Sequence, residues 1–147
     1  MKYVFDTDVL VAAIRSPSGA SAALVVRALQ AGKVQVAASV ALFVEYEATC
    51  TRAEHLHAAG LQLADVSDFL DRLASLVDHT EIHYLWRPQV RDPADDMVLE
   101  AAVNAVADAI VTFNTKDFGK IPDRFGIQVV LPREALARIQ IKGAEHG

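Results

Sequence analysis

The sequence has one cysteine, one tryptophan and five prolines, and no apolar run approaches the roughly 18 to 20 residues of a membrane span. The single thiol, Cys50, excludes an internal disulfide and indicates a protein of the reducing cytoplasm. The first eleven residues, MKYVFDTDVLV, meet an aspartate at position 6 and so lack the apolar core of a signal peptide. These shortages exclude collagens, coiled coils, secreted disulfide scaffolds and membrane proteins.

Size and composition indicate one globular domain that spans residues 1–147. Hydrophobic residues make up 52% of the chain and charged residues 22%, which is too apolar for a disordered protein. The net charge of −5 is uneven: residues 1–112 carry eight basic and fifteen acidic side chains, whereas residues 113–147 carry six basic and four acidic ones. An acidic protein is a poor candidate for tight, non-specific nucleic-acid binding. It can still act on a phosphate substrate if its carboxylates hold metal ions.

Apolar runs alternate with helical patterns along the chain. We expect strands at 2–5, 34–38, 81–85, 109–112 and 127–131, and a turn at 6–8. We expect helices at 20–31, 39–51, 65–77, 94–106 and 132–139, with 52–64 as a connection and 87–93 as a loop. This alternation predicts an α/β fold of three layers, with a mostly parallel central sheet of about five strands flanked by helices.

Acidic residues follow two of the predicted strands. Asp6 comes directly after the first strand, and Asn114 and Asp117 follow the strand at 109–112. Ligands of open parallel sheets bind beyond the carboxyl ends of the strands. Glu45, in the helix capped by Ser39, and Asp96, at the start of the helix from 94, belong to the same edge. We therefore predict a cluster of Asp6, Glu45, Asp96 and Asp117, with Asn114 beside it.

Such a cluster needs a physical reason, because neighbouring carboxylates raise one another's pKa and destabilise the fold. A divalent cation removes this cost, and Mg²⁺ or Mn²⁺ suits a site made only of oxygen ligands. Glu45 is the most informative member, since it lies in the apolar stretch 40–46 where an unpaired charge is expensive. The residues thus predict metal-assisted hydrolysis of a phosphate bond.

Four segments in this order resemble the PIN-domain ribonucleases. They are Phe5-Asp6-Thr7-Asp8-Val9-Leu10, Val44-Glu45-Tyr46-Glu47, Arg91-Asp92-Pro93-Ala94-Asp95-Asp96 and Ile110-Val111-Thr112-Phe113-Asn114-Thr115-Lys116-Asp117-Phe118. The chain is most similar to the VapC group, the toxins of bacterial toxin–antitoxin pairs. Two positions differ from the family's pattern, which commonly has asparagine in place of Asp8 and often an acid in place of Asn114.

The resemblance implies a PIN-like domain that cleaves RNA endonucleolytically with Mg²⁺ or Mn²⁺. It implies that Asp6 and Asp96 hold the metal and that Glu45 orients or deprotonates the attacking water. Asn114 or Asp117 completes the shell, and Thr112 positions it. An antitoxin partner and a homodimer follow from the resemblance as well.

Two other functions compete with this interpretation. Asp6-Thr7-Asp8 after an apolar strand also resembles the nucleophile motif of haloacid-dehalogenase-type phosphatases, although Asp95 and Asp96 precede Thr112 and Lys116, which is the wrong order for that family. A catalytically degenerate module that binds RNA or a partner is the second, supported by Asn114 and the net negative charge.

Several further polar residues have structural interpretations. We expect Asp92 to stiffen the loop before Pro93, and Asp108 to act as a cap at the opposite end of its strand from Asn114. His55 and His57 are two residues apart, which suits no usual zinc pattern, so we expect both on the solvated surface. Cys50 has no histidine nearby in sequence and is expected to be a small buried hydrophobe.

Overall fold

A computed structural model describes residues 1–28, 32, 34–83 and 92–146, with side chains described up to residue 26 in the first of these ranges and up to 139 in the last. Five parallel strands form its sheet, in the order β3-β2-β1-β4-β5. They are β1 (Lys2–Phe5), β2 (Gln35–Ala38), β3 (Asp78–His79), β4 (Ala109–Val111) and β5 (Gln128–Val130). The expected parallel α/β architecture of about five strands is confirmed.

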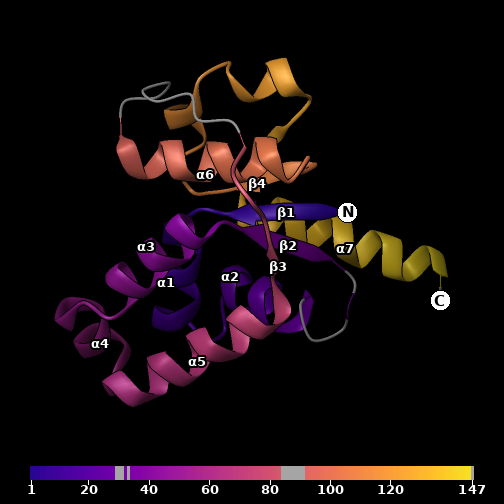
Figure 1. Ribbon diagram of the computed structural model, residues 1–147. Helices are drawn as coiled ribbons and strands as arrows, with labels where there is room; N and C mark the ends of the chain where they lie inside the picture. The colour runs from indigo at the N-terminus through magenta and orange to yellow at the C-terminus, as the bar shows by residue number, and fades with distance from the viewer. Residues whose placement is uncertain (29–31, 33, 84–91, 147) are drawn as a thin grey trace.

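Helices cover both sides of the sheet (Figure 1). They are α1 (Thr7–Arg15), α2 (Ala20–Ala22), α3 (Val40–Cys50), α4 (Ala53–Ala59), α5 (Leu63–Leu76), α6 (Pro93–Asn104) and α7 (Pro132–His146), with a π-helix η1 (Ala23–Ala28) and short 3-10 helices η2 (Thr115–Phe118) and η3 (Pro122–Phe125). In this view α6 lies above the strands, and α1, α2 and α5 lie below them. The strands form the middle of three layers.

The order of the strands creates a switch point between β1 and β4. From β1 the chain builds the sheet outwards through β2 to β3, then returns to add β4 and β5 on the other side of β1. In open parallel sheets, ligands bind at this kind of reversal, beyond the carboxyl ends of the strands. Asp6 and Thr112 directly follow the two strands at that point.

The two strands at the switch point, β1 and β4, are apolar and buried from Tyr3 to Phe5 and from Ala109 to Val111. Tyr3, Val4 and Phe5 of β1 are fully buried, as are the three residues of β4. Strands covered by helices on both faces need continuous apolar sequence rather than alternation, which is why these two segments were the clearest strands in the sequence. Cys50 is fully buried too, and burial raises the pKa of its thiol to about 12, as expected of a small core residue.

The structure corrects three of the expected boundaries. A helix, α1, begins at Thr7, inside the turn expected at 6–8, and its buried residues Val9, Leu10, Ala13 and Ile14 have helical spacing. The expected helix 20–31 consists of α2 and the π-helix η1 up to residue 28, and its end lies outside the described residues. The expected connection 52–64 contains α4, which ends where Gly60 adopts a left-handed conformation, with φ of 68°.

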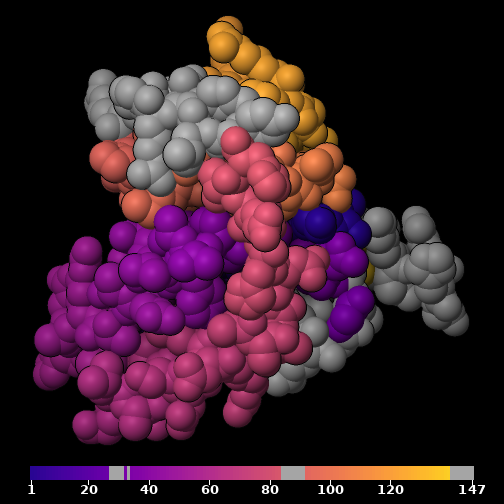
Figure 2. Space-filling model, in the orientation of Figure 1, coloured from indigo at the N-terminus to yellow at the C-terminus, as the bar shows by residue number. Residues whose placement is uncertain are grey.

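The strand expected at 81–85 is wrong in its described part. The strand β3 is Asp78–His79, directly after α5, and residues 81–83 are not in a strand. Both side chains of β3 are exposed, and Figure 2 shows the segment that follows α5 running along the surface of the molecule. An edge strand of two polar residues has no apolar pattern from which it could be predicted. The rest of the expected strand, and the loop 87–91, lie outside the described residues.

The amino ends of the strands have a simple polar arrangement. The carboxylate of Asp108 accepts a hydrogen bond of 2.7 Å from the backbone N–H of Lys2, so it caps this edge as expected. Nearby, Val106 follows α6 with φ of 54° and is 83% exposed. A left-handed conformation is unfavourable for a β-branched residue. This turn therefore holds backbone strain at the edge opposite Asp6.

In the described residues no single helix is long and apolar enough to cross a membrane. One pair passes the same test by length and composition together, Thr7–Arg15 with Ala20–Val26, but it is bent by 109°.

Candidate active site

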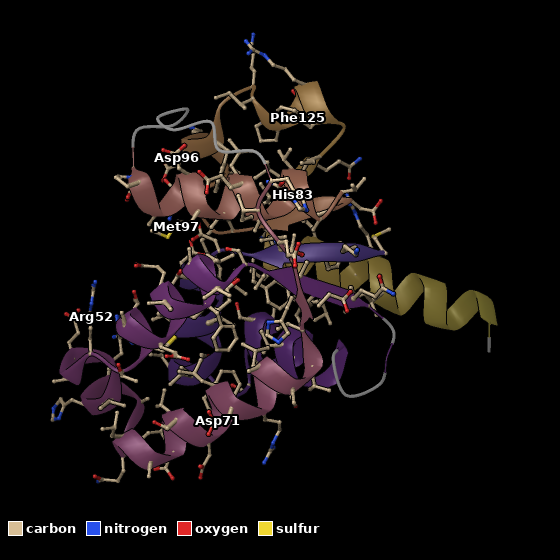
Figure 3. All side chains as sticks on the ribbon, in the orientation of Figure 1. Arg52, Asp71, His83, Asp96, Met97 and Phe125 are labelled. Atoms are coloured by element: carbon tan, nitrogen blue, oxygen red, sulfur yellow. The ribbon has the colours of Figure 1, made fainter. Side chains whose placement is uncertain are left out.

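A cleft of about 740 Å³ opens at the carboxyl ends of β1 and β4. Its acidic lining residues come from four parts of the chain and are Asp6, Asp8, Glu45, Asp92, Asp95 and Asp117. Arg15 and Arg52 are the arginines among the lining residues, and Asn114 and His55 also border it. In Figure 3, Arg52 and Asp96 both lie on the side of the molecule towards which β1 runs. Among the lining residues that the structure describes, carboxylates thus outnumber cationic side chains.

Asp6 is the best-anchored carboxylate of the cleft. It lies between β1 and α1, is 8% exposed, and donates its backbone N–H to the carbonyl of Val111 over 2.9 Å. The hydroxyl of Thr112, which is fully buried, donates to Asp6 Oδ2 over 2.8 Å. Thr112, which was expected to position the site, therefore contacts Asp6. The two residues directly follow the neighbouring strands β4 and β1.

Asp8 ties the start of α1 to the segment after β4. Its Oδ2 accepts hydrogen bonds from the backbone N–H of Phe113 and from the side-chain amide of Asn114, each over 3.1 Å. Its other oxygen, Oδ1, is buried and has no hydrogen-bond partner within the described part of the chain. Asn114 uses its amide nitrogen for this contact, which leaves its carbonyl oxygen as the atom that could bind a cation.

Burial and mutual repulsion disfavour the charged forms of three carboxylates. Burial raises the pKa of Asp6, and the hydrogen bond from Thr112 opposes that rise. Burial, reinforced by the charge of Asp6, raises the pKa of Asp8 to about 7. The pKa of Asp95 is also raised to about 7, first by burial and then by the charges of Asp6, Asp92, Asp117 and Asp8. Asp6, Asp8, Asp92, Asp95 and Asp117 therefore lie close enough for their charges to act on one another.

Glu45 lies on α3 and lines the cleft, as expected of a residue near the attacking water. One of its carboxylate oxygens accepts a hydrogen bond of 3.1 Å from the hydroxyl of Thr49, one turn further along the helix. Ser39 caps α3, accepting from the N–H of Leu42 over 3.1 Å. Tyr46, the residue after Glu45, is buried, and its hydroxyl donates a hydrogen bond to the carbonyl of Phe5 at the end of β1. This bond fixes α3, and with it Glu45, against the strand that leads to Asp6.

Asp96, the expected metal ligand on α6, is 3% exposed and does not line the cleft, whereas Asp95 does. In Figure 3, Asp96 lies above the ribbon of α6 near its N-terminal end and Met97 lies below it. Neighbouring residues of a helix point about 100° apart, so Asp95 and Asp96 leave α6 in different directions, and Asp95 is the one that lines the cleft. The structure thus brings together Asp6, Glu45, Asn114 and Asp117, and adds Asp95.

The segment after β4 supplies Asp117. It lies in η2, borders the cleft, and also lines an adjoining recess of about 510 Å³ with Asp92, Asp95 and Lys116. Asp92 is the N-cap of α6, where its Oδ1 accepts from the N–H of Ala94 over 2.9 Å, so it does stiffen the start of this helix. The recess brings the ammonium of Lys116 close to the acidic edge.

Sequence reasoning missed several of the lining residues. Arg15 ends α1, a helix that was not expected, and Arg52 is the N-cap residue of α4, in the segment expected to be a connection. His55 was expected on the solvated surface, but its side chain is only 14% exposed and its Nδ1 is buried without a hydrogen-bond partner in the described segments. The helical spacing of the apolar residues after Thr7 was the signal that could have revealed Arg15.

The donor set fits a hard divalent cation by its chemistry. Every acidic lining residue offers carboxylate oxygens, which Mg²⁺ and Mn²⁺ prefer, and the raised pKa of three of them is the cost that bound positive charge would remove. No three His, Cys, Asp or Glu side chains among the described residues converge closely enough to form a ready-made ligand sphere. Asp6, Asp95 and Asp117 would have to approach one another to bind one ion directly.

Comparison with known proteins identifies the family. The model of the PIN domain family matches residues 2–116, which is most of the chain, and the protein therefore belongs to the PIN domain family.

A solved structure shares its fold. A chain in the crystal structure of VapBC2 from Rickettsia felis bound to a DNA fragment from their promoter superimposes with a TM-score of 0.62 at 17% sequence identity. The match covers 89% of this chain and 98% of that one. Comparison with curated proteins gave no match.

Proposed function

We propose that this protein is an endoribonuclease that depends on Mg²⁺ or Mn²⁺ and acts as the toxin of a toxin–antitoxin pair. The observation that carries the proposal is the acidic cleft at the β1–β4 switch point, where three buried or half-buried carboxylates have raised pKa values. A fold does not retain such a cluster for stability, because each member would be more stable as a neutral residue. Cation binding and hydrolysis explain it.

We assign different roles in the proposed reaction to the residues of the cleft according to their positions. Asp6 and Asp95 are the carboxylates that would hold the ion, and the carbonyl oxygen of Asn114 or the carboxylate of Asp117 would complete its shell. The bound ion would supply positive charge for the phosphodiester and lower the pKa of a bound water. Glu45, which accepts a hydrogen bond from the Thr49 hydroxyl, would orient the attacking water and accept its proton.

The choice of Asp95 in place of Asp96 rests on cleft lining and on its electrostatic coupling to Asp6. Asp96 stays a candidate from the sequence, and the two residues are adjacent and identical in chemistry. Asp95→Asn and Asp96→Asn therefore form a matched pair of variants. The variant that loses RNA cleavage identifies which of the two aspartates holds the ion.

RNA as the substrate is supported by the family and by the cations at the rim. Arg15 and Arg52 border the cleft and Lys116 lines the adjoining recess, so phosphates on either side of the scissile bond would meet positive charge. Replacing Lys116 by alanine should weaken RNA binding and reduce its salt dependence. If both are unchanged, Lys116 does not contact the backbone of the RNA.

The toxin role is supported by the PIN family match and by the fold shared with a chain of VapBC2. We propose an antitoxin protein as the partner and a homodimer as the assembly. The phosphatase alternative is set aside because the chain belongs to the PIN domain family.

The test incubates the purified protein with a mixed pool of single-stranded and structured RNA, with Mn²⁺ or with EDTA, beside Asp6→Asn. We expect cleavage only by the unaltered protein with Mn²⁺, and a loss of at least about a hundredfold in Asp6→Asn. Intact RNA in every reaction, with folded protein that binds Mn²⁺, would instead establish a binding module. Cleavage by Asp6→Asn at the normal rate would overturn the site.

A further inference from the structure

A second, mostly apolar pocket of about 390 Å³ adjoins the acidic cleft. It lies between the start of α2, the segment after β4 and the start of α7, and its walls include Ser21, Leu131, Pro132 and Arg133. Ala12, Ser16 and Phe113 line both this pocket and the cleft. A ligand that fills the pocket therefore continues directly into the space where the phosphodiester would lie.

Phe113 stands at the boundary between the two spaces. It directly follows Thr112, the hydrogen-bond donor to Asp6, and its own backbone N–H donates to Asp8 over 3.1 Å. Its side chain is 48% exposed although it is a large aromatic. The backbone of Phe113 is thus fixed by the catalytic edge, while its ring remains available to a ligand.

Ser21 supplies an unused polar group on the pocket wall. It lies on α2, is 4% exposed, and its hydroxyl is buried without a hydrogen-bond partner in the described parts of the chain. A buried hydroxyl without a partner is unfavourable, and a hydroxyl can both donate and accept. A ligand with a polar edge and apolar faces would satisfy Ser21 and still fit the remaining walls.

Arg133 gives the pocket its charge. It is exposed at the second position of α7, directly after Pro132, and no acidic side chain lines the pocket in the described part of the chain. A guanidinium at the mouth of an apolar pocket suits a ligand that carries a phosphate. The acidic cleft next to it is opposite in character, so the two spaces favour different parts of one molecule.

We propose that this pocket binds the base of the nucleotide next to the scissile phosphate in a single-stranded RNA. Phe113 stacks on the base, Ser21 hydrogen-bonds to its edge, and Arg133 contacts the following phosphate. A nucleobase combines flat apolar faces with a polar edge and is linked to a phosphate, which matches Phe113, Ser21 and Arg133 in turn. The inference rests on the proposed function, since it assumes that the phosphodiester lies in the acidic cleft.

The test uses short single-stranded RNAs in which one nucleotide at a time is abasic. At one position beside the cleavage site, loss of the base should lower kcat/KM roughly five- to hundredfold, the range expected for one stacked base. Phe113→Leu, which keeps the apolar surface, should cause a similar loss on intact RNA and no further loss on the abasic RNA. Ser21→Ala should show the same pattern with a loss of roughly two- to tenfold. Phe125→Leu is the matched control, because Phe125 is also half-exposed and lies on η3 away from both spaces.

The affinity of Asp6→Asn for the same RNAs separates this inference from the proposed function. If the unaltered protein does not cleave but the affinity still depends on that base, Phe113 and Ser21, the pocket is supported and the nuclease is not. If cleavage occurs and neither abasic position nor either variant alters it, the pocket assignment is wrong and the nuclease stands. A loss of affinity for a protein partner alone, with RNA unaffected, would also overturn the assignment.

Discussion

The two ends of the central strands carry the same residue type under opposite conditions. At the amino end, Asp108 is exposed and its carboxylate accepts a single strong hydrogen bond from Lys2. At the carboxyl end, Asp6 and Asp8 are withdrawn from water, their pKa values are raised, and one oxygen of Asp8 has no hydrogen-bond partner in the described part of the structure. The hydrogen bond of Asp108 stabilises the folded state, whereas the burial of Asp6 and Asp8 destabilises it.

This difference distinguishes Asp108, which stabilises the fold, from the aspartates to which we propose a function. An N–H group at the end of a strand is satisfied by one carboxylate in solvent, so nothing in a parallel sheet requires several buried ones. The polarity of the sheet decides where the extra acids lie, because the switch point exists only at the carboxyl edge. The comparison predicts that replacing an aspartate by asparagine has different effects on cleavage, metal binding and stability at the carboxyl ends of the strands and at their amino ends.

The largest contrast should be in catalysis. Asp95→Asn should reduce RNA cleavage by at least about a hundredfold, because it removes a charged group from the cleft, while Asp108→Asn should leave the rate unchanged. Rates on one RNA at fixed Mn²⁺ measure both. Equal rates for the two variants would remove the functional distinction between the edges.

A smaller contrast should appear in metal binding. Saturating the unaltered protein with Mn²⁺ at about a hundred times its Kd should raise the free energy of unfolding by about 2.7 kcal/mol, a shift in Tm of about 5 to 10 °C. Asp6→Asn should lose this shift and Asp108→Asn should keep it. Thermal scans with Mn²⁺ and with EDTA provide the measurement, and a protein indifferent to Mn²⁺ would contradict a cation site.

The pH dependence of stability should differ as well. The pKa of Asp8 is about 7 in the folded protein against 3.8 for an unperturbed aspartate, so between these values the folded chain holds the proton more tightly. In EDTA, the free energy of unfolding should therefore fall as the pH rises from about 4 to about 7 and level off above that. Asp8→Asn should reduce this fall, to which the raised pKa values of Asp6 and Asp95 also contribute, and Asp108→Asn should not change it. Denaturant titrations at several pH values test this prediction. If Asp8→Asn does not change the slope of the free energy of unfolding against pH, burial of Asp8 does not destabilise the fold.

The smallest effect belongs to the amino edge. Val106 is exposed and has a left-handed backbone, so Val106→Gly should raise the free energy of unfolding by about 1 kcal/mol. Val44→Gly is the control, since Val44 is exposed within α3 and glycine should destabilise that helix. Cleavage should not change in Val106→Gly. Equal loss of stability in both variants would show that Val106 is not strained.

The sequence predicted the central elements because their patterns are local. Continuous apolar runs identified β1 and β4, Ser39 identified the start of α3, and Pro132 identified the start of α7. The helix α1 was missed because Asp6, Thr7 and Asp8 are typical of a turn, although the apolar residues after them have helical spacing. Polar strands such as β3 depend on pairing with β2, which no local pattern contains.

The candidate site was predictable in its location but not in its side chains. Sheet polarity placed Asp6, Asn114 and Asp117 at one edge. The choice between Asp95 and Asp96 depends on how α6 is rotated about its axis, and α6 is buried on several sides: Val98, Leu99, Glu100, Ala101 and Ala102 are all buried. Without a single apolar stripe, the sequence does not specify which aspartate faces the cleft.

The hydrogen bond between Thr112 and Asp6 joins residues that are 106 positions apart. During synthesis on a ribosome, β1 emerges long before β4, and it has no neighbour on that side until residues 109–111 have left the exit tunnel. Contacts of such long sequence separation form late and slowly. The cleft is therefore assembled only after synthesis has passed β4, and Asp6 and Thr112 remain apart until then.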